Sequence, residues 1–240
     1  MSKGASTPSH RLWYHNGTLP HFDAADLIQA ITFRLADSLP LQVLERIDRD
    51  VEAKYHDDDV RSRERRRRID AAVDRGLGSC LLRLPTCAAI VRDTMLRDHG
   101  QRCWFLAWVI MPNHVHVLIR QIEGHPLASL VQTWKSLSAR RIATLTGTTG
   151  GIWQRDYWDR HIRDADHYAR CVDYIHRNPV TAGLVHEIGA WPWSSAYRKW
   201  RSEGVAPRAV DGGVDAPFVD GVALRAVDGG VDAPSFGAIL

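Results

Sequence analysis

The sequence lacks the features of membrane proteins, secreted proteins and zinc ribbons. No stretch approaches the roughly 18 consecutive apolar residues of a membrane-spanning helix, and the N-terminal residues include no apolar segment of the secretory kind. The chain has four cysteines among 240 residues and no CxxC pair, which argues against a disulfide framework and a zinc ribbon. We therefore expect a cytoplasmic protein with no membrane partner and with reduced, buried thiols at Cys80, Cys87, Cys103 and Cys171.

Positive charge is concentrated in the first 200 residues. This part holds 28 basic and 22 acidic residues, whereas residues 201–240 hold three arginines and six acidic residues. Arginine is the main basic residue, and its planar guanidinium can bind two phosphate oxygens at once. The imbalance favours a polyanionic partner.

The C-terminal segment is a near repeat of low complexity. The stretch RAVDGGVDAP occurs at 208–217 and again at 225–234. Its composition leaves little apolar surface to bury, and two copies are fewer than the roughly three that a solenoid needs. We predict one folded domain over residues 11–200, which the hydrophobic content of 45% can support, and a disordered tail over 201–240.

Hydrophobic periodicity predicts an α+β fold. Alternating or continuous apolar runs between turn residues indicate strands, and apolar residues spaced by three and four indicate helices. The predicted strands are 27–37, 102–112, 114–120 and 152–162. The predicted helices are 39–55, 61–76, 87–100, 126–145 and 164–179. This order is that of a ferredoxin-like fold, a single antiparallel sheet with its helices packed on one face, in which 102–120 forms a hairpin of central strands.

The last predicted helix has recognisable ends. Asp164 or Asp166 is a suitable N-cap, because a carboxylate there can accept a hydrogen bond from the first turn. Pro179 is expected to end the helix, since the residue before a proline disfavours the helical conformation.

Two histidines, His114 and His116, interrupt the apolar strand 114–120. Side chains two positions apart on a strand point to the same face, at a spacing suited to one divalent ion. With 12 histidines in 240 residues, about half a pair of this spacing is expected by chance. The alternative is therefore that the two histidines share a strand without binding a metal. The cost of burying an unpartnered imidazole favours the metal pair.

Tyr174 and Asn178 provide matching chemistry on the last helix. They are four residues apart, so they lie one turn apart on one face. The amide oxygen of Asn178 is a suitable ligand for Mg²⁺ or Mn²⁺. Tyr174 beside such a cation can attack a phosphodiester and retain it as a phosphotyrosine ester. The alternative for Tyr174 is a half-buried structural tyrosine.

Several segments resemble those of the REP-associated tyrosine transposases, relatives of the single-tyrosine transposases within the HUH endonucleases. Together they cover about residues 11–200. The matching segments are AWVIMPNHVHVLI (107–119), IWQRDYWDRHIRD (152–164), HYARCVDYIHRNPVTAGLV (167–185) and WPWSSAY (191–197), with WYHNGTLPHF and ITFRLADSLP near the N-terminus. The arginine-rich segment 61–76 departs from the shared pattern, so no role is carried over to it.

The resemblance implies an HUH core in which His114 and His116 are the metal pair, Asn178 is the third ligand and Tyr174 is the nucleophile. It implies cleavage and rejoining of single-stranded DNA beside REP hairpins, through a 5′-phosphotyrosine link that leaves a free 3′-hydroxyl. Relatives of this kind often act as monomers. If Tyr174 is not the nucleophile, Tyr157 and Tyr168 are the substitutes.

Basic and aromatic residues are candidates for DNA contacts. In the helix 126–145 we expect the basic residues on an outward face. Trp134 and Trp158 are candidates for stacking on unpaired bases, although core packing is the alternative for both. The candidate phosphate contacts are Arg61, Arg63, Arg65, Arg66, Arg67, Arg68, Lys135, Arg140, Arg141 and Arg155.

Two other function classes use the same residues. A non-catalytic hairpin-binding protein would keep the basic surface without metal-dependent nicking. A metal-dependent phosphoesterase would use the histidines with water as the nucleophile, and would tolerate the loss of Tyr174.

Overall fold

The computed structural model describes residues 13–15, 20–22 and 27–199. The predicted tail, 201–240, lies outside the described residues, so its disorder stays a prediction. Within the described part, no helix combines the length and the apolar character that crossing a bilayer requires.

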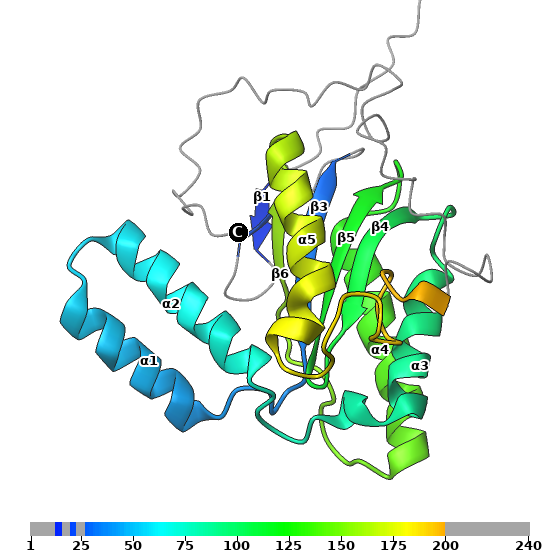
Figure 1. The fold of residues 1–240 in the computed structure, drawn as a ribbon, viewed down its shortest axis with the longest axis horizontal. Helices are drawn as coiled ribbons and strands as arrows, with labels where there is room; N and C mark the ends of the chain where they lie inside the picture. The colour runs from blue at the N-terminus through cyan, green and yellow to red at the C-terminus, as the bar shows by residue number, and fades with distance from the viewer. Residues whose placement is uncertain (1–12, 16–19, 23–26, 200–240) are drawn as a thin grey trace, which may run out of the picture.

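A four-stranded antiparallel sheet forms the centre of the fold (Figure 1). Its strands are β3 (Ile28–Arg34), β4 (Cys103–Ile110), β5 (His114–Gln121) and β6 (Trp158–His161), in the order β4-β5-β3-β6. The α+β class and the single main sheet of the prediction are confirmed. Two short strands, β1 (Trp13–His15) and β2 (Pro20–Phe22), pair with each other in a separate sheet.

Helices cover both faces of the sheet, and the prediction of one covered face is wrong in this respect. Val115 and Val117 of β5 pack in a core cluster with α3 (Pro85–Leu96) and α4 (Leu127–Thr146). Leu118 packs in a second cluster with α5 (Ala165–Thr181) on the opposite face. The near-continuous apolar residues of β4 and β5 agree with a sheet that is covered on both faces, since a strand covered on one face alternates apolar and polar residues.

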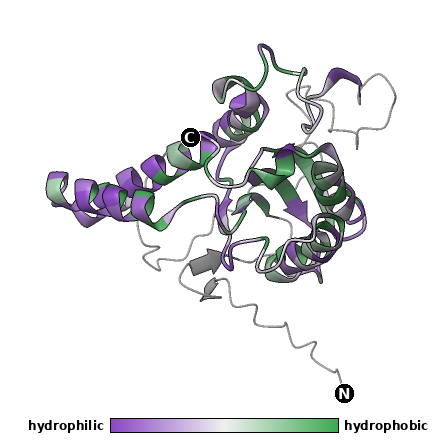
Figure 2. Ribbon diagram, turned by 90° about the horizontal axis from the view of Figure 1, so that it is seen from below, coloured by the Kyte–Doolittle hydropathy of each residue, from purple (hydrophilic) through white to green (hydrophobic). Residues whose placement is uncertain are grey.

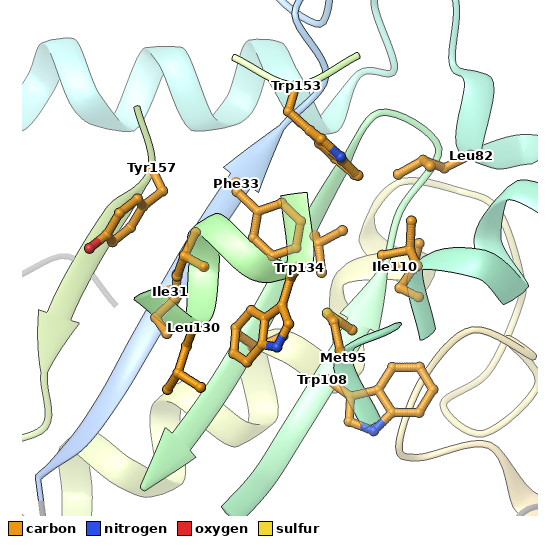
Figure 3. Packing of buried hydrophobic residues seen from close by; sticks show 14 of the residues in the cluster. Ile31, Phe33, Leu82, Met95, Trp108, Ile110, Leu130, Trp134, Trp153 and Tyr157 are labelled. Carbon is orange, nitrogen blue, oxygen red and sulfur yellow. The ribbon is translucent and has the colours of Figure 1, made fainter. Parts of the chain in front are cut away.

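The larger core cluster contains several of the tryptophans (Figure 3). Phe33 meets Trp153 edge to face, with ring centroids 5.0 Å apart. Trp134 is 1% exposed and donates from Nε1 to Asp98 Oδ2 over 2.8 Å. Trp134 is therefore a core residue, so of the two roles considered for it core packing is confirmed and base stacking is not. All four cysteines are free and buried, as predicted.

The strand β4 lies at the edge of the sheet, not at its centre as predicted. The segment 191–197 covers that edge: Ile110 N–H donates to the Trp193 carbonyl over 2.8 Å, and Ser195 N–H donates to the Trp108 carbonyl over 2.9 Å. This cover explains how an edge strand can be as apolar as β4.

A helical hairpin follows β3 and precedes α3 in the chain. It consists of α1 (Leu41–Lys54) and α2 (Asp58–Asp74), followed by the short 3₁₀ helix η1 (Leu81–Arg83). Val51 and Val73 belong to a small separate core cluster between the two helices. The hairpin projects from the sheet and its surface is largely hydrophilic (Figures 1 and 2).

The helix α5 starts as predicted and ends later than predicted. Asp164 is the N-cap, with Oδ1 accepting from His167 N–H over 2.6 Å. Pro179 lies inside the helix, which continues to Thr181. Proline removes only one donor in this last turn, and Ala182 N–H still donates to the Asn178 carbonyl over 2.9 Å.

Candidate metal and tyrosine site

The strand β5 holds two imidazoles side by side on the face that α5 covers. Its pairing with β3 sets Arg34 opposite His114 and Thr32 opposite His116. His114 Nε2 and His116 Nε2 lie 3.0 Å apart, and both side chains are buried. The shared face that the alternation predicts is therefore present.

Asn113 fixes the tautomer of His114. The Asn113 amide nitrogen donates to the Val73 and Leu77 carbonyls, each over 3.0 Å, which leaves its oxygen toward His114 Nδ1 at 2.8 Å. An amide oxygen only accepts, so His114 Nδ1 carries the hydrogen. The lone pair of a neutral His114 is then on Nε2, where a cation can bind it.

Thr32 allows His116 to serve in the same way. Thr32 Oγ1 lies 2.8 Å from His116 Nδ1, and a hydroxyl can either donate or accept. When the hydroxyl accepts, His116 Nε2 is free to bind a cation. Burial, and next the repulsion of His114, lower the pKa of His116 to about 3, so this imidazole is neutral at physiological pH.

Asp74, at the end of α2, adds a carboxylate to the histidine pair. Its Oδ1 lies 3.3 Å from His114 Nε2. Burial, the largest influence, would raise the pKa of Asp74, but its interactions with His114, and then with His116 and Asn178, together outweigh burial, and the net pKa is lowered. Ligand atoms of Asp74, His114 and His116 all lie within 4.8 Å of one another. Asp74 was not among the predicted ligands.

The helix α5 brings Tyr174 and Asn178 to the same place. The Tyr174 ring lies edge to face with His116, with centroids 5.2 Å apart. Asn178 is buried, and its Oδ1 has no hydrogen-bond partner among the described residues. Hydrogen bonding to the Asn178 side chain also lowers the pKa of both Tyr174 and Asp74.

The Tyr174 phenol is strongly held in its protonated form. Burial raises its pKa far above the usual value, and the charges of Asp74 and Asp70 raise it further. The positive charge of Arg66 opposes this rise. An attack by this phenol on phosphorus therefore needs positive charge close to it.

The two substitute tyrosines lie elsewhere. Tyr157 is buried in the core cluster on the other face of the sheet. Tyr168 is on α5, where burial raises its pKa, and it packs against the α5-side cluster. The sheet thus separates Tyr157 from the histidine pair.

The predicted DNA-contacting residues are spread over both sides of the molecule. Those of α2 mostly pair with acids of the hairpin: Arg61 with Asp58, Arg65 with Asp48, and Arg67 and Arg68 with Glu64, while Arg63 Nε donates to the Asp59 carbonyl. Arg66 contacts Asp70 and lies over the Trp158 ring, with its Cζ 3.3 Å from the ring centroid.

The α4 residues lie on the sheet face opposite to the histidines. Arg140 and Arg141 are exposed there. Lys135 is only 8% exposed, so its predicted outward orientation is wrong. Its Nζ donates to the Arg155 carbonyl over 2.6 Å, and burial lowers the pKa of Lys135 to about 8. The Arg155 side chain is exposed.

The residues present fit a divalent cation. Two imidazole nitrogens and a carboxylate oxygen converge, and the unpartnered Asn178 oxygen is a further oxygen donor on the adjoining helix. A mixed nitrogen and oxygen donor set of this kind is compatible with Mn²⁺ or Mg²⁺. Asp74 is thus a candidate ligand in addition to Asn178.

Comparison with known proteins links the same segment to transposases. Residues 90–178 match the model of the IS200-like transposase family, Y1_Tnp. A REP-associated tyrosine transposase of Escherichia coli K12 is 34% identical over 94 residues, which are 38% of this chain and 53% of the relative. A Haemophilus influenzae Rd protein, given the same name provisionally, is 32% identical over 108 residues, 41% of this chain and 61% of the relative.

The chain thus spans between a half and two thirds of the length of these curated relatives. A solved structure of a REP-associated tyrosine transposase bound to a REP hairpin covers 80% of this chain and 89% of its own, with 19% identity and a TM-score of 0.46. The family model and the curated relatives confirm the resemblance seen in the sequence, and the matched segment from α3 to α5 contains His114, His116, Tyr174 and Asn178.

Proposed function

We propose that this chain cuts and rejoins single-stranded DNA beside REP-type hairpins, through a 5′-phosphotyrosine intermediate and with a divalent cation. The observation that carries the proposal is the contact between the Tyr174 and His116 rings, 5.2 Å apart, beside a cluster of cation ligands. A phenol next to a cation site is the arrangement that strand cleavage by tyrosine requires. The association with REP sequences is carried over from the names of the curated relatives, and the hairpin from the family resemblance of the sequence.

His114, His116 and Asp74 would hold the cation, with Asn178 as a further ligand. A bound Mg²⁺ or Mn²⁺ supplies positive charge that polarises the scissile phosphate and offsets charge on the leaving oxygen. Asn113 and Thr32 keep the two imidazoles oriented with Nε2 toward the ligand cluster.

Tyr174 is the nucleophile in this proposal. Its phenolic oxygen loses its proton to solvent and forms a bond to phosphorus, while the bond from phosphorus to the 3′-oxygen breaks. The leaving oxygen keeps the electron pair and takes up a proton, which gives a free 3′-hydroxyl. The reverse attack by a 3′-hydroxyl on the phosphotyrosine restores the phosphodiester and the phenol, so joining needs no nucleotide cofactor.

The test is a denaturing gel of the protein incubated with labelled, hairpin-flanked single strands, with and without Mn²⁺. We expect a protein-linked band that requires Mn²⁺ and is absent in Tyr174→Phe, while hairpin binding persists in that variant. Tyr157→Phe and Tyr168→Phe serve as matched controls and should keep the band. Adduct formation at the wild-type yield in Tyr174→Phe contradicts the assignment.

The same preparation separates the other function classes. Hairpin binding without any adduct in Mn²⁺ would indicate a non-catalytic binding protein. Hydrolysis of a small phosphodiester that Tyr174→Phe retains would indicate a phosphoesterase that uses water as its nucleophile.

A further inference from the structure

One face of the helix α2 carries three charged side chains that lead toward the candidate site. Arg66, Asp70 and Asp74 are spaced by four residues, so they share one face of α2. The last of them, Asp74, lies 3.3 Å from His114 Nε2. Asn113 ties this end of α2 to the β4–β5 turn through the Val73 carbonyl. The α1–α2 hairpin is therefore anchored at the site although its outer part projects into solvent (Figures 1 and 2).

Arg66 lies over the sheet next to the imidazoles. Its Cζ is 3.3 Å from the ring centroid of Trp158 on β6. In the sheet, Trp158 is opposite Thr32, and Thr32 is opposite His116, so these residues form one row on the α5-covered face. The charge of Arg66 acts on Tyr174, whose pKa it lowers. Residues of five elements thus lie together: Arg66 of α2, Trp158 of β6, Thr32 of β3, His116 of β5 and Tyr174 of α5.

The guanidinium of Arg66 contacts Trp158 and Asp70, but these contacts do not occupy all of its hydrogen-bond donors. Its Nε lies 3.3 Å from Asp70 Oδ2, and within the described part of the chain its two terminal nitrogens have no hydrogen-bond partner. Arg65 and Arg67 of the same helix differ from Arg66, since each makes two hydrogen bonds to one carboxylate. Arg66 thus keeps donors for a ligand beside Tyr174.

A guanidinium stacked on an aromatic ring is already oriented, so little conformational freedom is lost when it binds an anion. Its planar donors match two oxygens of a phosphate. Asp70 is the carboxylate beside this guanidinium, with Oδ2 3.3 Å from Arg66 Nε, and burial raises the pKa of Asp70.

We propose that Arg66, held over Trp158 by the inserted α1–α2 hairpin, binds the non-bridging oxygens of the phosphate that Tyr174 attacks. This rests on the proposed function and adds a catalytic residue to it. Arg66 stabilises the negative charge of the phosphoryl group as the bond to Tyr174 forms and the bond to the 3′-oxygen breaks. Trp158 is the support of this arginine, and its ring face is not available for stacking on a base while Arg66 lies over it.

The test compares Arg66→Ala and Arg66→Lys with the control Arg49→Ala, an exposed arginine on α1 of the same hairpin. Single-turnover adduct formation is measured with a labelled strand that the wild type cleaves, and the affinity for that strand is measured separately in chelator. We expect Arg66→Ala to slow adduct formation by about 100-fold or more, Arg66→Lys to recover part of the rate, and Arg49→Ala to behave as wild type. The affinity of all variants for the strand should change far less than the rate.

A second substrate distinguishes phosphate contact from a structural effect. It carries a methylphosphonate at the mapped scissile position, which removes the negative charge that Arg66 is proposed to bind. The rate difference between wild type and Arg66→Ala should then largely disappear. A difference that persists on this substrate, or an Arg66→Ala rate equal to that of Arg49→Ala on the normal strand, overturns the inference while leaving the proposed function intact. Absence of an adduct with the wild type overturns both.

Discussion

Thr32 and His116 face each other across β3 and β5, and Thr32 Oγ1 lies 2.8 Å from His116 Nδ1. The hydroxyl of Thr32 can accept a hydrogen bond from His116 Nδ1, which leaves the lone pair of His116 on Nε2, 3.0 Å from His114 Nε2. A residue without any proposed ligand atom thus supports the tautomer in which the imidazole pair can hold a cation.

Replacing Thr32 by valine should weaken cation binding. Valine keeps the shape of threonine but leaves His116 Nδ1 without an acceptor, which disfavours the tautomer whose Nε2 binds a cation. We expect the Mn²⁺ affinity, measured by electron paramagnetic resonance, to fall by about 10-fold to 100-fold in Thr32→Val. Thr32→Ser keeps the hydroxyl and should bind as wild type, whereas equal affinities in all three proteins would refute this role.

Asp74→Asn should also lower the affinity for Mn²⁺, by about 10-fold or more. The substitution removes a negative charge 3.3 Å from His114 Nε2. Asp59→Asn, the same change in the exposed first turn of α2, is the control and should leave the affinity unchanged. Isothermal titration with Mn²⁺ in the absence of DNA measures both. An Asp74→Asn affinity equal to the control would exclude Asp74 as a ligand.

The sequence predicted the parts of the site that local geometry determines. The alternation of β5 placed His114 and His116 on one face, and the helical spacing placed Tyr174 and Asn178 one turn apart. It did not identify Asp74, because α2 looked like a solvated arginine-rich helix and its approach to His114 depends on tertiary structure. The spacing of Asp70 and Asp74 behind Arg66 was the available signal.

Lys135 illustrates a different error. It follows the buried Val131 by four positions and precedes the buried Ile142 by seven, so helical geometry places it on the core face of α4. Its charge suggested an outward orientation, but the long side chain reaches the Arg155 carbonyl. The second helix layer was missed because the fold was assigned from the order of strands and helices, although the near-continuous apolar run of β4 is typical of a strand covered on both faces.

Lys135 should make stability depend on pH in an alkaline window. Its folded pKa of about 8 is below its usual 10.5. Between these values the unfolded chain binds more protons at this position than the folded chain, so its contribution to the free energy of unfolding rises with pH, by at most about 3 kcal/mol. Urea denaturation at a series of pH values should show this rise for the wild type relative to Lys135→Met. Parallel curves for the two proteins would show that Lys135 titrates normally.

Asp164→Ala should destabilise the protein by about 1 kcal/mol, because it removes the acceptor for His167 N–H at the start of α5. Asp166→Ala is the matched control, since Asp166 is exposed and lies in the first turn without capping the helix. Its loss should be smaller. Urea denaturation measures both, and an equal or larger loss for Asp166→Ala would contradict the cap assignment.

The most direct test of the account is to identify the residue that carries DNA after cleavage in Mn²⁺. Proteolysis of the covalent adduct, followed by mass spectrometry, locates the attached nucleotide. We predict a 5′-phosphate ester on Tyr174. A nucleotide on Tyr157 or Tyr168, or cleavage without any attached peptide, would contradict the claim that this α5 phenol acts beside the histidine pair of β5.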